Sequence, residues 1–176
     1  MLVVVITGPI ASGKSTLGRA VAVELAGRGF DSAVIDLDLV YEMLDPSPRP
    51  KTDEARWREA RRLAAKIAAG LSGRRAAVVV EGEFATAEQR IELSDELPHD
   101  WRACFVSLTV DFDHAWERVM ADPTRGVSKN RDFLAAHYRA LGNARPDDRD
   151  LVLDTGEISI STAARSVADW LLNTPE

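Results

Sequence analysis

The sequence predicts an α/β fold, in which one parallel β-sheet is covered by helices on both faces and a single domain spans residues 1–176. Three observations predict it. Short apolar runs alternate with segments of helical periodicity along the chain, an order typical of parallel strands joined by crossover helices. The runs are uniformly apolar, as expected of strands buried on both faces. The chain has 176 residues, the size of one ordinary domain, and no internal repeat or low-complexity linker divides it.

The first strand and helix are the clearest elements. Residues 2–7 (LVVVIT) form a β-branched apolar run, which predicts a buried strand. Apolar side chains then recur at intervals of four from Leu17 to Leu25, which predicts a helix. Because glycine favours the end of a helix, we expect this one to stop at Gly27 or Gly29.

A strand, a proline-rich loop and a long helix are expected next. Residues 32–36 (SAVID) form the second apolar run. Three prolines within residues 46–50 exclude a regular helix there and indicate an exposed loop. Residues 53–71 have helical spacing, with Trp57 and Ile67 on one side.

The same alternation continues through the second half of the chain. Strands are expected within residues 75–83, 103–110 and 150–155. Helices are expected within residues 88–97, 113–120, 133–141 and 162–172. Residues 121–132 (ADPTRGVSKNRD) interrupt the pattern and predict a polar, basic loop.

Composition limits the class of partner. The net charge of −6 argues against a nucleic-acid-binding protein, which needs a basic surface to neutralise phosphates. No segment approaches the roughly 20 apolar residues of a membrane span, and residues 1–11 lack the basic region of a secretory signal. The only cysteine, Cys104, has no partner for an internal disulfide, which fits a reducing compartment. We therefore expect a cytoplasmic protein that binds neither nucleic acid nor membrane.

A complete phosphate-binding loop (P-loop) follows the first strand. Gly8, Gly13, Lys14 and Ser15 match the pattern Gly-x-x-x-x-Gly-Lys-Ser between a strand and a helix. Glycines let successive N–H groups converge on phosphate oxygens, lysine reaches the terminal phosphates, and the serine hydroxyl binds Mg²⁺. The residues expected to contact the nucleotide here are Gly8, Ile10, Ala11, Ser12, Gly13, Lys14, Ser15 and Thr16. The sequence thus predicts binding of a nucleoside triphosphate with Mg²⁺.

Three classes of protein use such a loop. A GTPase needs an Asn-Lys-x-Asp motif, and residues 128–132 (SKNRD) have these letters in the wrong order. A motor ATPase needs a second acid at the end of a strand, which Glu81 could supply, but the domain is small for that class. A small phosphotransferase is favoured by Asp36 and Asp38 at the carboxyl end of the second strand, where open α/β sheets bind ligands.

The two aspartates predict metal binding and base catalysis. Residues two apart on a strand share a face, so we expect both carboxylates to point at the P-loop. One would hold Mg²⁺ through water, and the other would take the proton of an acceptor hydroxyl. The alternative is a helix N-cap or a solvated acidic pair. Which aspartate is the base stays open at this point.

The chain resembles the small P-loop kinases: adenylyl-sulfate, shikimate and gluconate kinases and chloramphenicol phosphotransferases. The resemblance rests on residues 8–38 and on LVLDTGEISI at residues 151–160, and covers nearly the whole chain. It implies strand order 2-3-1-4-5 and a lid over the nucleotide. It also implies that Asp38 is the base and that Asp36 lies near the metal.

The same resemblance assigns acceptor and lid residues. Tyr41 stands where adenylyl-sulfate kinases carry a substrate-gripping arginine, and Glu81 opens an acidic segment after the third strand, so both are expected in the acceptor pocket. Residues 121–132 are the expected lid. Arg125 is the lid arginine expected to close on the transferred phosphoryl group, and Arg118 resembles the arginine that stacks on adenine. The alternative for the lid cations is a solvated basic loop.

A second basic group lies in the long helix. Arg58 and Arg62 are one turn apart and could grip an acidic acceptor, but an outer charged face that includes Arg61 and is paired with Glu54 and Glu59 is favoured. Trp57 is expected in the core or in a pocket wall. The three histidines lack metal-ligand spacing and receive no role.

These observations predict an ATP- and Mg²⁺-dependent kinase that transfers the γ-phosphoryl group to a hydroxyl of a small molecule, which is a metabolite, nucleoside or antibiotic. Lys14 and Arg125 would stabilise the migrating group, Ser15 and Asp36 would hold the metal, and Asp38 would activate the acceptor. The alternatives are adenylyl-sulfate kinase itself and a nucleotide-gated binding ATPase that phosphorylates nothing. Monomer and homodimer both stay open.

Overall fold

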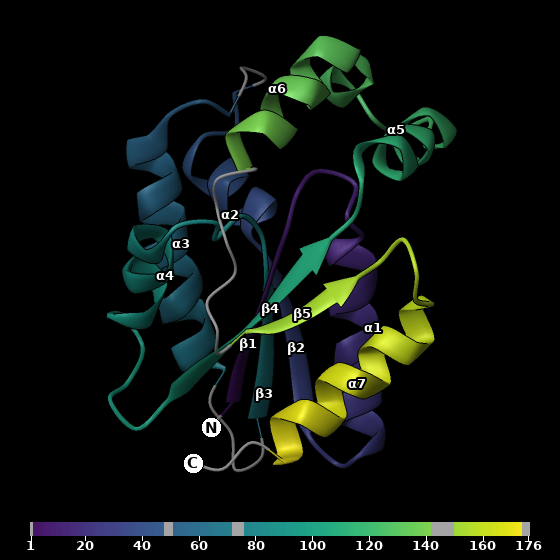
Figure 1. Cartoon of the computed structure of the whole chain (residues 1–176). Helices are drawn as coiled ribbons and strands as arrows, with labels where there is room; N and C mark the ends of the chain where they lie inside the picture. Colours follow the sequence, from purple (N-terminus) through teal and green to yellow (C-terminus); the bar gives the residue numbers. More distant parts are fainter. Residues whose placement is uncertain (1, 48–50, 72–75, 142–149, 174–176) are drawn as a thin grey trace.

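The computed structural model describes residues 2–47, 51–71, 76–141 and 150–173, and its centre is a five-stranded parallel sheet (Figure 1). The strand order is β2-β3-β1-β4-β5, as the family resemblance implied. The strands are β1 (Leu2–Thr7), β2 (Asp31–Asp36), β3 (Ala76–Glu81), β4 (Arg102–Thr109) and β5 (Leu151–Asp154). Because all pairings are parallel, the carboxyl ends of the strands meet at one edge of the sheet.

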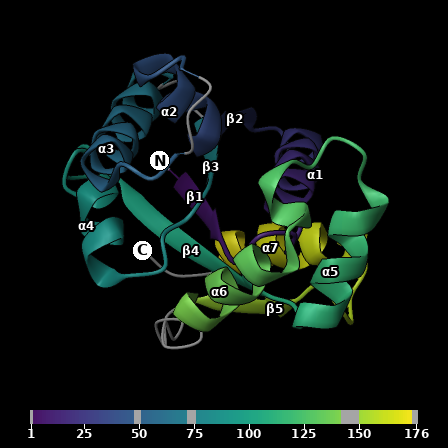
Figure 2. The same ribbon diagram turned by 90° about the horizontal axis from the view of Figure 1, so that it is seen from above.

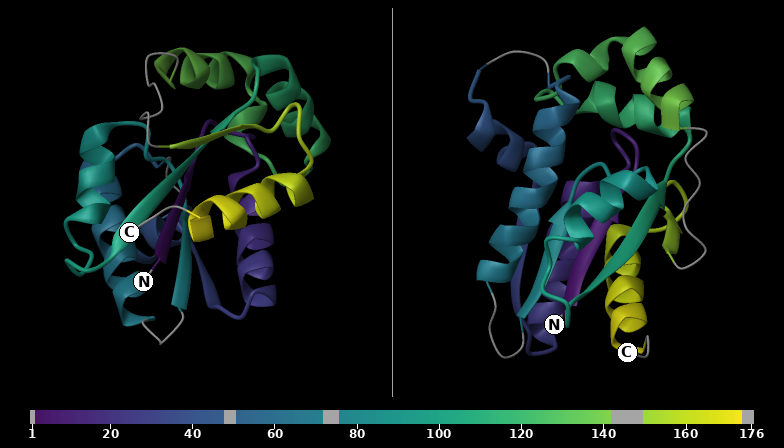
Figure 3. Two further views of the ribbon diagram at one scale, coloured as in Figure 1. Left: turned by 60° about the horizontal axis from the view of Figure 1, so that its bottom comes forward. Right: turned by 90° about the vertical axis from the view of Figure 1, so that its left-hand side faces the viewer.

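Helices cover both faces and the carboxyl edge of the sheet (Figures 1 and 2). The helices are α1 (Lys14–Gly27), α2 (Leu37–Leu44), α3 (Glu54–Gly70), α4 (Ala87–Ser94), α5 (Phe112–Ala121), the 3₁₀ helix η1 (Val127–Lys129), α6 (Arg131–Leu141) and α7 (Ile160–Asn173). Helices α1 and α7 lie on one face, and α3 and α4 lie on the other (Figure 3). Helices α5 and α6 lie beyond the carboxyl ends of the strands. None of the helices within the described ranges has the length and apolarity to cross a bilayer.

The uniform apolar runs supply two cores, one on each face of the sheet. Val3 and Val5 of β1 pack against the alanine side chains of α3. Val4 and Ile6 pack against Leu17 and the other buried residues of α1 and α7. Alternate residues of one strand therefore serve opposite layers. A third, smaller core joins the P-loop to α5 and α6. Helices α5 and α6 are thus held against the P-loop by an apolar core of their own.

Most expected elements form, with small shifts at their ends. The helix expected over Leu17 and Leu25 is α1, and it ends at Gly27, the first of the two glycines proposed to stop it. The proline-rich stretch lies partly outside the described residues, which omit 48–50. The expected loop at 121–132 is less irregular than predicted, because it contains η1 and the start of α6.

Gly8 is required by the close approach of β4 to the P-loop. Its φ is +155°, and a Cβ there would lie 2.8 Å from the Leu108 carbonyl oxygen and 2.8 Å from Ser12 Oγ. We expect Gly8→Ala to lower the free energy of unfolding by about 2 kcal/mol, from backbone strain and overpacking. Urea denaturation measures this. Gly70→Ala is the matched control, since its Cβ would meet nothing within 4 Å; equal stabilities of the two variants would contradict the prediction.

Candidate functional site

The P-loop curls between β1 and α1 with two residues in left-handed conformation. Ala11 has φ of +64°, and Gly13, the N-cap of α1, has φ of +90°. Among the described residues, no side chain caps this end of α1. The unpaired N–H groups of a helix start, together with the helix dipole, form a site for an anion. The local backbone is therefore that of a phosphate-binding loop.

Lys14 lies at the start of α1 and folds over the loop. Its Nζ donates hydrogen bonds to the carbonyl oxygens of Gly8 at 2.8 Å and Pro9 at 3.0 Å. Burial lowers the pKa of Lys14, and the nearby carboxylates of Glu83 and Glu81 act against that shift. The ammonium group thus lies among acidic side chains. When a nucleotide binds, the hydrogen bonds of this group to the two carbonyl oxygens can be replaced by hydrogen bonds to phosphate oxygens.

Ser15 contacts the acid that ends β3. Its Oγ donates a hydrogen bond to Glu81 Oε2 at 2.8 Å. Burial raises the pKa of Glu81, and the hydrogen bond from Ser15 partly offsets this. Glu81 thus lies beside the hydroxyl expected to bind Mg²⁺, and its expected contact with the acceptor stays a prediction. A hydroxyl and a carboxylate are the hard oxygen ligands that this ion prefers.

Asp36 and Asp38 do not share the face of a strand, so that prediction is wrong. The chain turns into α2 directly after Asp36, whose Oδ1 accepts hydrogen bonds from the N–H groups of Asp38 at 2.9 Å and Leu39 at 3.4 Å. Aspartate is a favoured N-cap, and this preference ends the strand. Asp38 therefore lies in the first turn of α2. The metal role of Asp36 stays a prediction.

Asp38 has a cationic partner that the sequence analysis missed. Lys51 Nζ lies 2.9 Å from Asp38 Oδ1 and 2.9 Å from Glu42 Oε1. Burial alone would lower the pKa of Lys51, but the hydrogen bonds to the two carboxylates raise it. The acids are one helical turn apart on α2, a spacing that lets one ammonium bridge them. The proline-rich segment that carries Lys51 had suggested only a loop.

Arg118 of α5 joins the P-loop to the end of β5. Its Nη1 donates to the Ala11 carbonyl oxygen at 3.2 Å and to Thr155 Oγ1 at 3.0 Å. Thr155 Oγ1 in turn donates to the Ser12 carbonyl oxygen at 2.9 Å. Arg118 thus lies beside the P-loop, and its stacking on adenine stays a prediction.

Two residues of α6 bind the backbone of Ile10. Its N–H donates to His137 Nε2 at 3.1 Å, and its carbonyl oxygen accepts from Tyr138 Oη at 3.0 Å. Burial lowers the pKa of His137 to about 4, with the charge of Lys14 adding to the shift. Burial raises the pKa of Tyr138 to about 12. The neutral forms of both side chains match the hydrogen bonds they make.

The His137 contact predicts a pH-dependent stability. The ordinary pKa of 6.5 applies in the unfolded chain, whereas the folded pKa is about 4. Between these values the unfolded state binds more protons, so the free energy of unfolding falls as pH drops from 6.5 towards 4. We expect His137→Gln, which keeps an acceptor oxygen and does not titrate, to lose less stability over this range. Urea titrations across the range test it; equal losses in both proteins would contradict it.

Other predicted residues have different surroundings from those expected. Arg125 forms an ion pair with Asp122 at 3.2 Å and does not line the cavity described below. Tyr41 is buried, and its ring lies 4.3 Å from that of Trp57, whose indole forms part of the cavity wall. Tyr41 thus packs against the Trp57 ring and does not itself line the cavity.

The arginine-rich face of α3 is only partly the outer face that we expected. Arg61 is 2% exposed, so for this residue the prediction is wrong. Its Nε lies 2.5 Å from Oε2 of Glu92, which is 7% exposed, and it also pairs with Glu54. Arg58 pairs with Glu92 and Glu88, and Arg62 lies 3.7 Å from Glu96. Glu88 and Glu92 of α4 and Glu96 in the turn after it, all remote in sequence, stand in place of the expected partner Glu59.

A cavity of about 720 Å³ connects the P-loop to α2, α3 and α4. It is lined by Ile10, Lys14, Leu37, Asp38, Lys51, Thr52, Glu54, Trp57, Arg61, Gly82, Glu83, Gln89, Val127, Phe133 and His137. The P-loop lysine and the aspartate predicted as base therefore line one space. Val127 of η1 and Phe133 and His137 of α6 also line it. Of these, Val127 belongs to the segment expected as a lid, residues 121–132. Within the described ranges, no three acidic, histidine or cysteine side chains form a preformed metal cluster.

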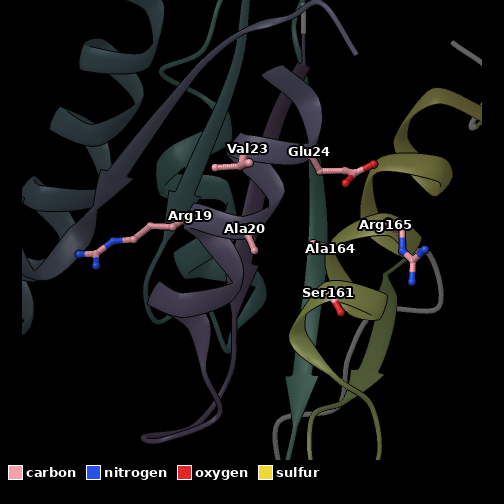
Figure 4. Close-up of a pocket in the computed structure, with 7 residues that line it drawn as sticks. All are labelled: Arg19, Ala20, Val23, Glu24, Ser161, Ala164 and Arg165. Carbon is pink, nitrogen blue, oxygen red and sulfur yellow. The ribbon is translucent and has the colours of Figure 1, made fainter. Parts of the chain in front are cut away.

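A second hollow of about 340 Å³ lies between α1 and α7 (Figure 4). Its lining comes from the outer surfaces of the two helices and includes Arg19, Val23, Glu24, Ser161 and Arg165. Because α1 and α7 cover the sheet face opposite α3 and α4, this hollow is separate from the Lys14–Asp38 cavity.

Comparisons with known proteins agree with this fold. A family model described as "AAA domain" matches residues 4–138. A search of curated proteins finds no match. The APS kinase CysC of Mycobacterium tuberculosis, solved with AMPPNP and APS, superposes with a TM-score of 0.69 at 23% identity over 98% of each chain.

Two further solved structures have the same architecture. A gluconokinase from Sinorhizobium meliloti 1021 has a TM-score of 0.67 at 21% identity, over 97% of this chain and 91% of its own. A sugar kinase from Janibacter sp. HTCC2649 has a TM-score of 0.72 at 20% identity, over 99% of this chain and 96% of its own. The fold is that of the small P-loop kinases.

Proposed function

Because the chain belongs to the AAA domain family and has the fold of the small P-loop kinases, we propose that it is an ATP- and Mg²⁺-dependent kinase that phosphorylates a hydroxyl of a small molecule. One observation carries the proposal. Lys14 of α1 and Asp38 of α2 line the same cavity, and the charge of Asp38 acts on the lysine. A phosphate-binding cation and a carboxylate base in one cavity are what transfer to a hydroxyl requires.

The chemistry can be assigned to named groups. Asp38 takes the proton of the acceptor hydroxyl, whose oxygen forms a bond to the γ-phosphorus of ATP. The bond from that phosphorus to the β-bridging oxygen breaks, and ADP leaves with the electron pair. Lys14 stabilises charge on the transferred group and the leaving oxygen. In the structure Lys51 holds the Asp38 carboxylate in place. When an acceptor enters, the same carboxylate also accepts a hydrogen bond from the acceptor hydroxyl.

The residues near Ser15 fit a magnesium ion. Its hydroxyl and the Glu81 carboxylate lie 2.8 Å apart, and the charge of Asp36 acts on Glu81. Ser15 would bind the ion directly, while Glu81 and Asp36 would hold its water ligands. Bound there, the ion would neutralise phosphate charge.

The lid completes the proposal. We assign residues 121–132 as a segment that closes over the nucleotide, with Arg125 moving from Asp122 to the γ-phosphate and Arg118 contacting adenine. The charge of Arg125 already acts on Lys14.

The single cysteine, Cys104, is buried and fits a reducing cytoplasm.

The test is ADP release from Mg·ATP over a panel of hydroxyl compounds, with mass spectrometry on each positive. The panel contains adenylyl sulfate, shikimate, gluconate, nucleosides, sugars and hydroxylated antibiotics. We expect at least one to stimulate release and to gain a phosphoryl group, and Lys14→Ala to abolish both. Slow hydrolysis that no acceptor stimulates would contradict the proposal and favour a nucleotide-gated binding protein.

A further inference from the structure

From the charges that line the Lys14–Asp38 cavity, and building on the proposed kinase activity, we propose that the acceptor carries no negative charge and that its hydroxyl or ammonium donors pair with Glu83. The inference concerns only the acceptor end of the cavity, formed by α2, α3, α4 and the residues after β3. It rests on how the cations there are paired, on Glu83, and on the apolar side of the wall.

Among the described residues, the two cations that line the acceptor end, Lys51 and Arg61, each have two carboxylate partners. Lys51 pairs with Asp38 and Glu42. Arg61 pairs with Glu54 and Glu92, and its side chain is 2% exposed. An acceptor carboxylate or sulfate would have to displace one of these acids and leave its charge without a partner. That exchange is unfavourable, most of all at the buried Arg61.

Among the described carboxylates that line this end, Glu83 is the one with no cation in contact. It follows Gly82 at the carboxyl end of β3 and lines the cavity. Among the described residues, none forms a hydrogen bond or an ion pair with its side chain. Glu83 is exposed as a residue and lines the cavity. Partial desolvation of its carboxyl group raises the pKa of Glu83, and the charge of Lys14 acts against this. A carboxylate with no cation beside it attracts donors such as hydroxyl or ammonium groups and repels a second anion.

The wall beside these charges is apolar. Trp57 and Leu37 line it, and the indole Nε1 donates to the Lys51 carbonyl oxygen at 3.0 Å, which fixes the ring. An indole face packs well against the C–H groups of a ring compound. Together the surroundings fit an uncharged or cationic polyhydroxyl compound with an apolar face.

The sign of the potential can be measured without an acceptor. Thr52 is exposed at the cavity wall, and the natural thiol of Cys104 is buried with a raised pKa, so Thr52→Cys adds the reactive thiol. We would measure the rates of modification by cationic and anionic methanethiosulfonate reagents. The reference is the same rate ratio for Ser161→Cys in the α1–α7 hollow. We expect the ratio at position 52 to favour the cationic reagent by about tenfold over the reference.

Charge removal identifies the source of this preference. In the Thr52→Cys protein, Glu83→Gln should reduce the ratio by about threefold, whereas Glu24→Gln, on α1 at the other sheet face, should not. A ratio that equals the reference or favours the anionic reagent would overturn the proposal. A ratio unchanged by Glu83→Gln would overturn the role of Glu83.

A matched set of acceptors tests the consequence for turnover. Glucosamine, glucose and glucuronate, added to the acceptor panel, differ in carrying an ammonium, a hydroxyl or a carboxylate group. Anionic members should give the lowest kcat/KM, and a preference for them would overturn the inference. If no compound stimulates ADP release, the kinase proposal fails. The thiol-rate ratio needs no phosphoryl transfer and still decides the charge of the cavity.

Discussion

Asp38→Asn is expected to lower the rate of phosphoryl transfer by about 10²- to 10⁴-fold and to leave the affinity for Mg·ATP within about twofold. The amide keeps the shape of the side chain and cannot take the proton of the acceptor hydroxyl. Single-turnover transfer with the acceptor found in the panel measures the first effect, and titration with a nucleotide measures the second. Unchanged transfer would show that the base lies elsewhere.

Glu42→Gln is the matched control for this variant. Glu42 is the other carboxylate that binds Lys51, at the same N–O distance of 2.9 Å and one turn further along α2. It does not line the cavity. Both variants therefore weaken one ion pair of Lys51, and only Asp38→Asn removes the proposed base. A large loss of transfer in both would instead assign the effect to the position of Lys51.

Arg61→Met is expected to lower the free energy of unfolding by about 3–5 kcal/mol, the largest loss of stability we predict. Among the described residues, Glu92, at 7% exposure, then keeps Arg58 alone as its cationic partner, in surroundings that burial makes unfavourable for a charge. Burial alone would raise the pKa of Glu92, but hydrogen bonds from Arg58 and Arg61 lower it. Urea denaturation at neutral pH measures the loss.

Arg62→Met removes the same side chain at the adjacent position. Arg62 is 53% exposed and lies 3.7 Å from Glu96, so its loss should cost less than about 1 kcal/mol. Arg61→Met combined with Glu92→Leu removes both charges and should recover part of the stability. If Arg61→Met and Arg62→Met are equally stable, the ion pair of Arg61 contributes little to folding.

Much of the fold is predictable because the signals are local. Runs such as residues 2–7 are too apolar to be anything but buried, and glycine and proline mark where they end. The strand order came from the family resemblance, since parallel pairings between distant segments leave no periodicity of their own. The P-loop was predictable because its residues are contiguous and each has a physical role.

The acceptor side of the site was harder to predict, because long-range contacts decide it. Asp36 can either continue an extended strand or act as the N-cap of a helix. In the structure it is the N-cap of α2, so the strand does not extend to Asp38 as we expected. Lys51 meets Asp38 across 13 positions of the chain, a contact that no local pattern marks. Arg61 and Arg62 look equivalent in sequence, and only the packing of α4 against α3 buries one of them. His137 had no motif, yet it binds the P-loop from 127 residues away.

The central place of β1 has a consequence for synthesis. This strand is flanked by β3 and β4, which follow it by about 70 and 95 residues, and β2 pairs with β3 rather than with β1. At ribosomal speeds of about 5–20 residues per second, residues 2–7 wait roughly 4–14 s before either partner strand has been made. Throughout that interval an almost wholly apolar segment has no sheet to join. A chaperone that holds short extended apolar segments therefore has its longest opportunity at the strand that leads into the phosphate-binding loop.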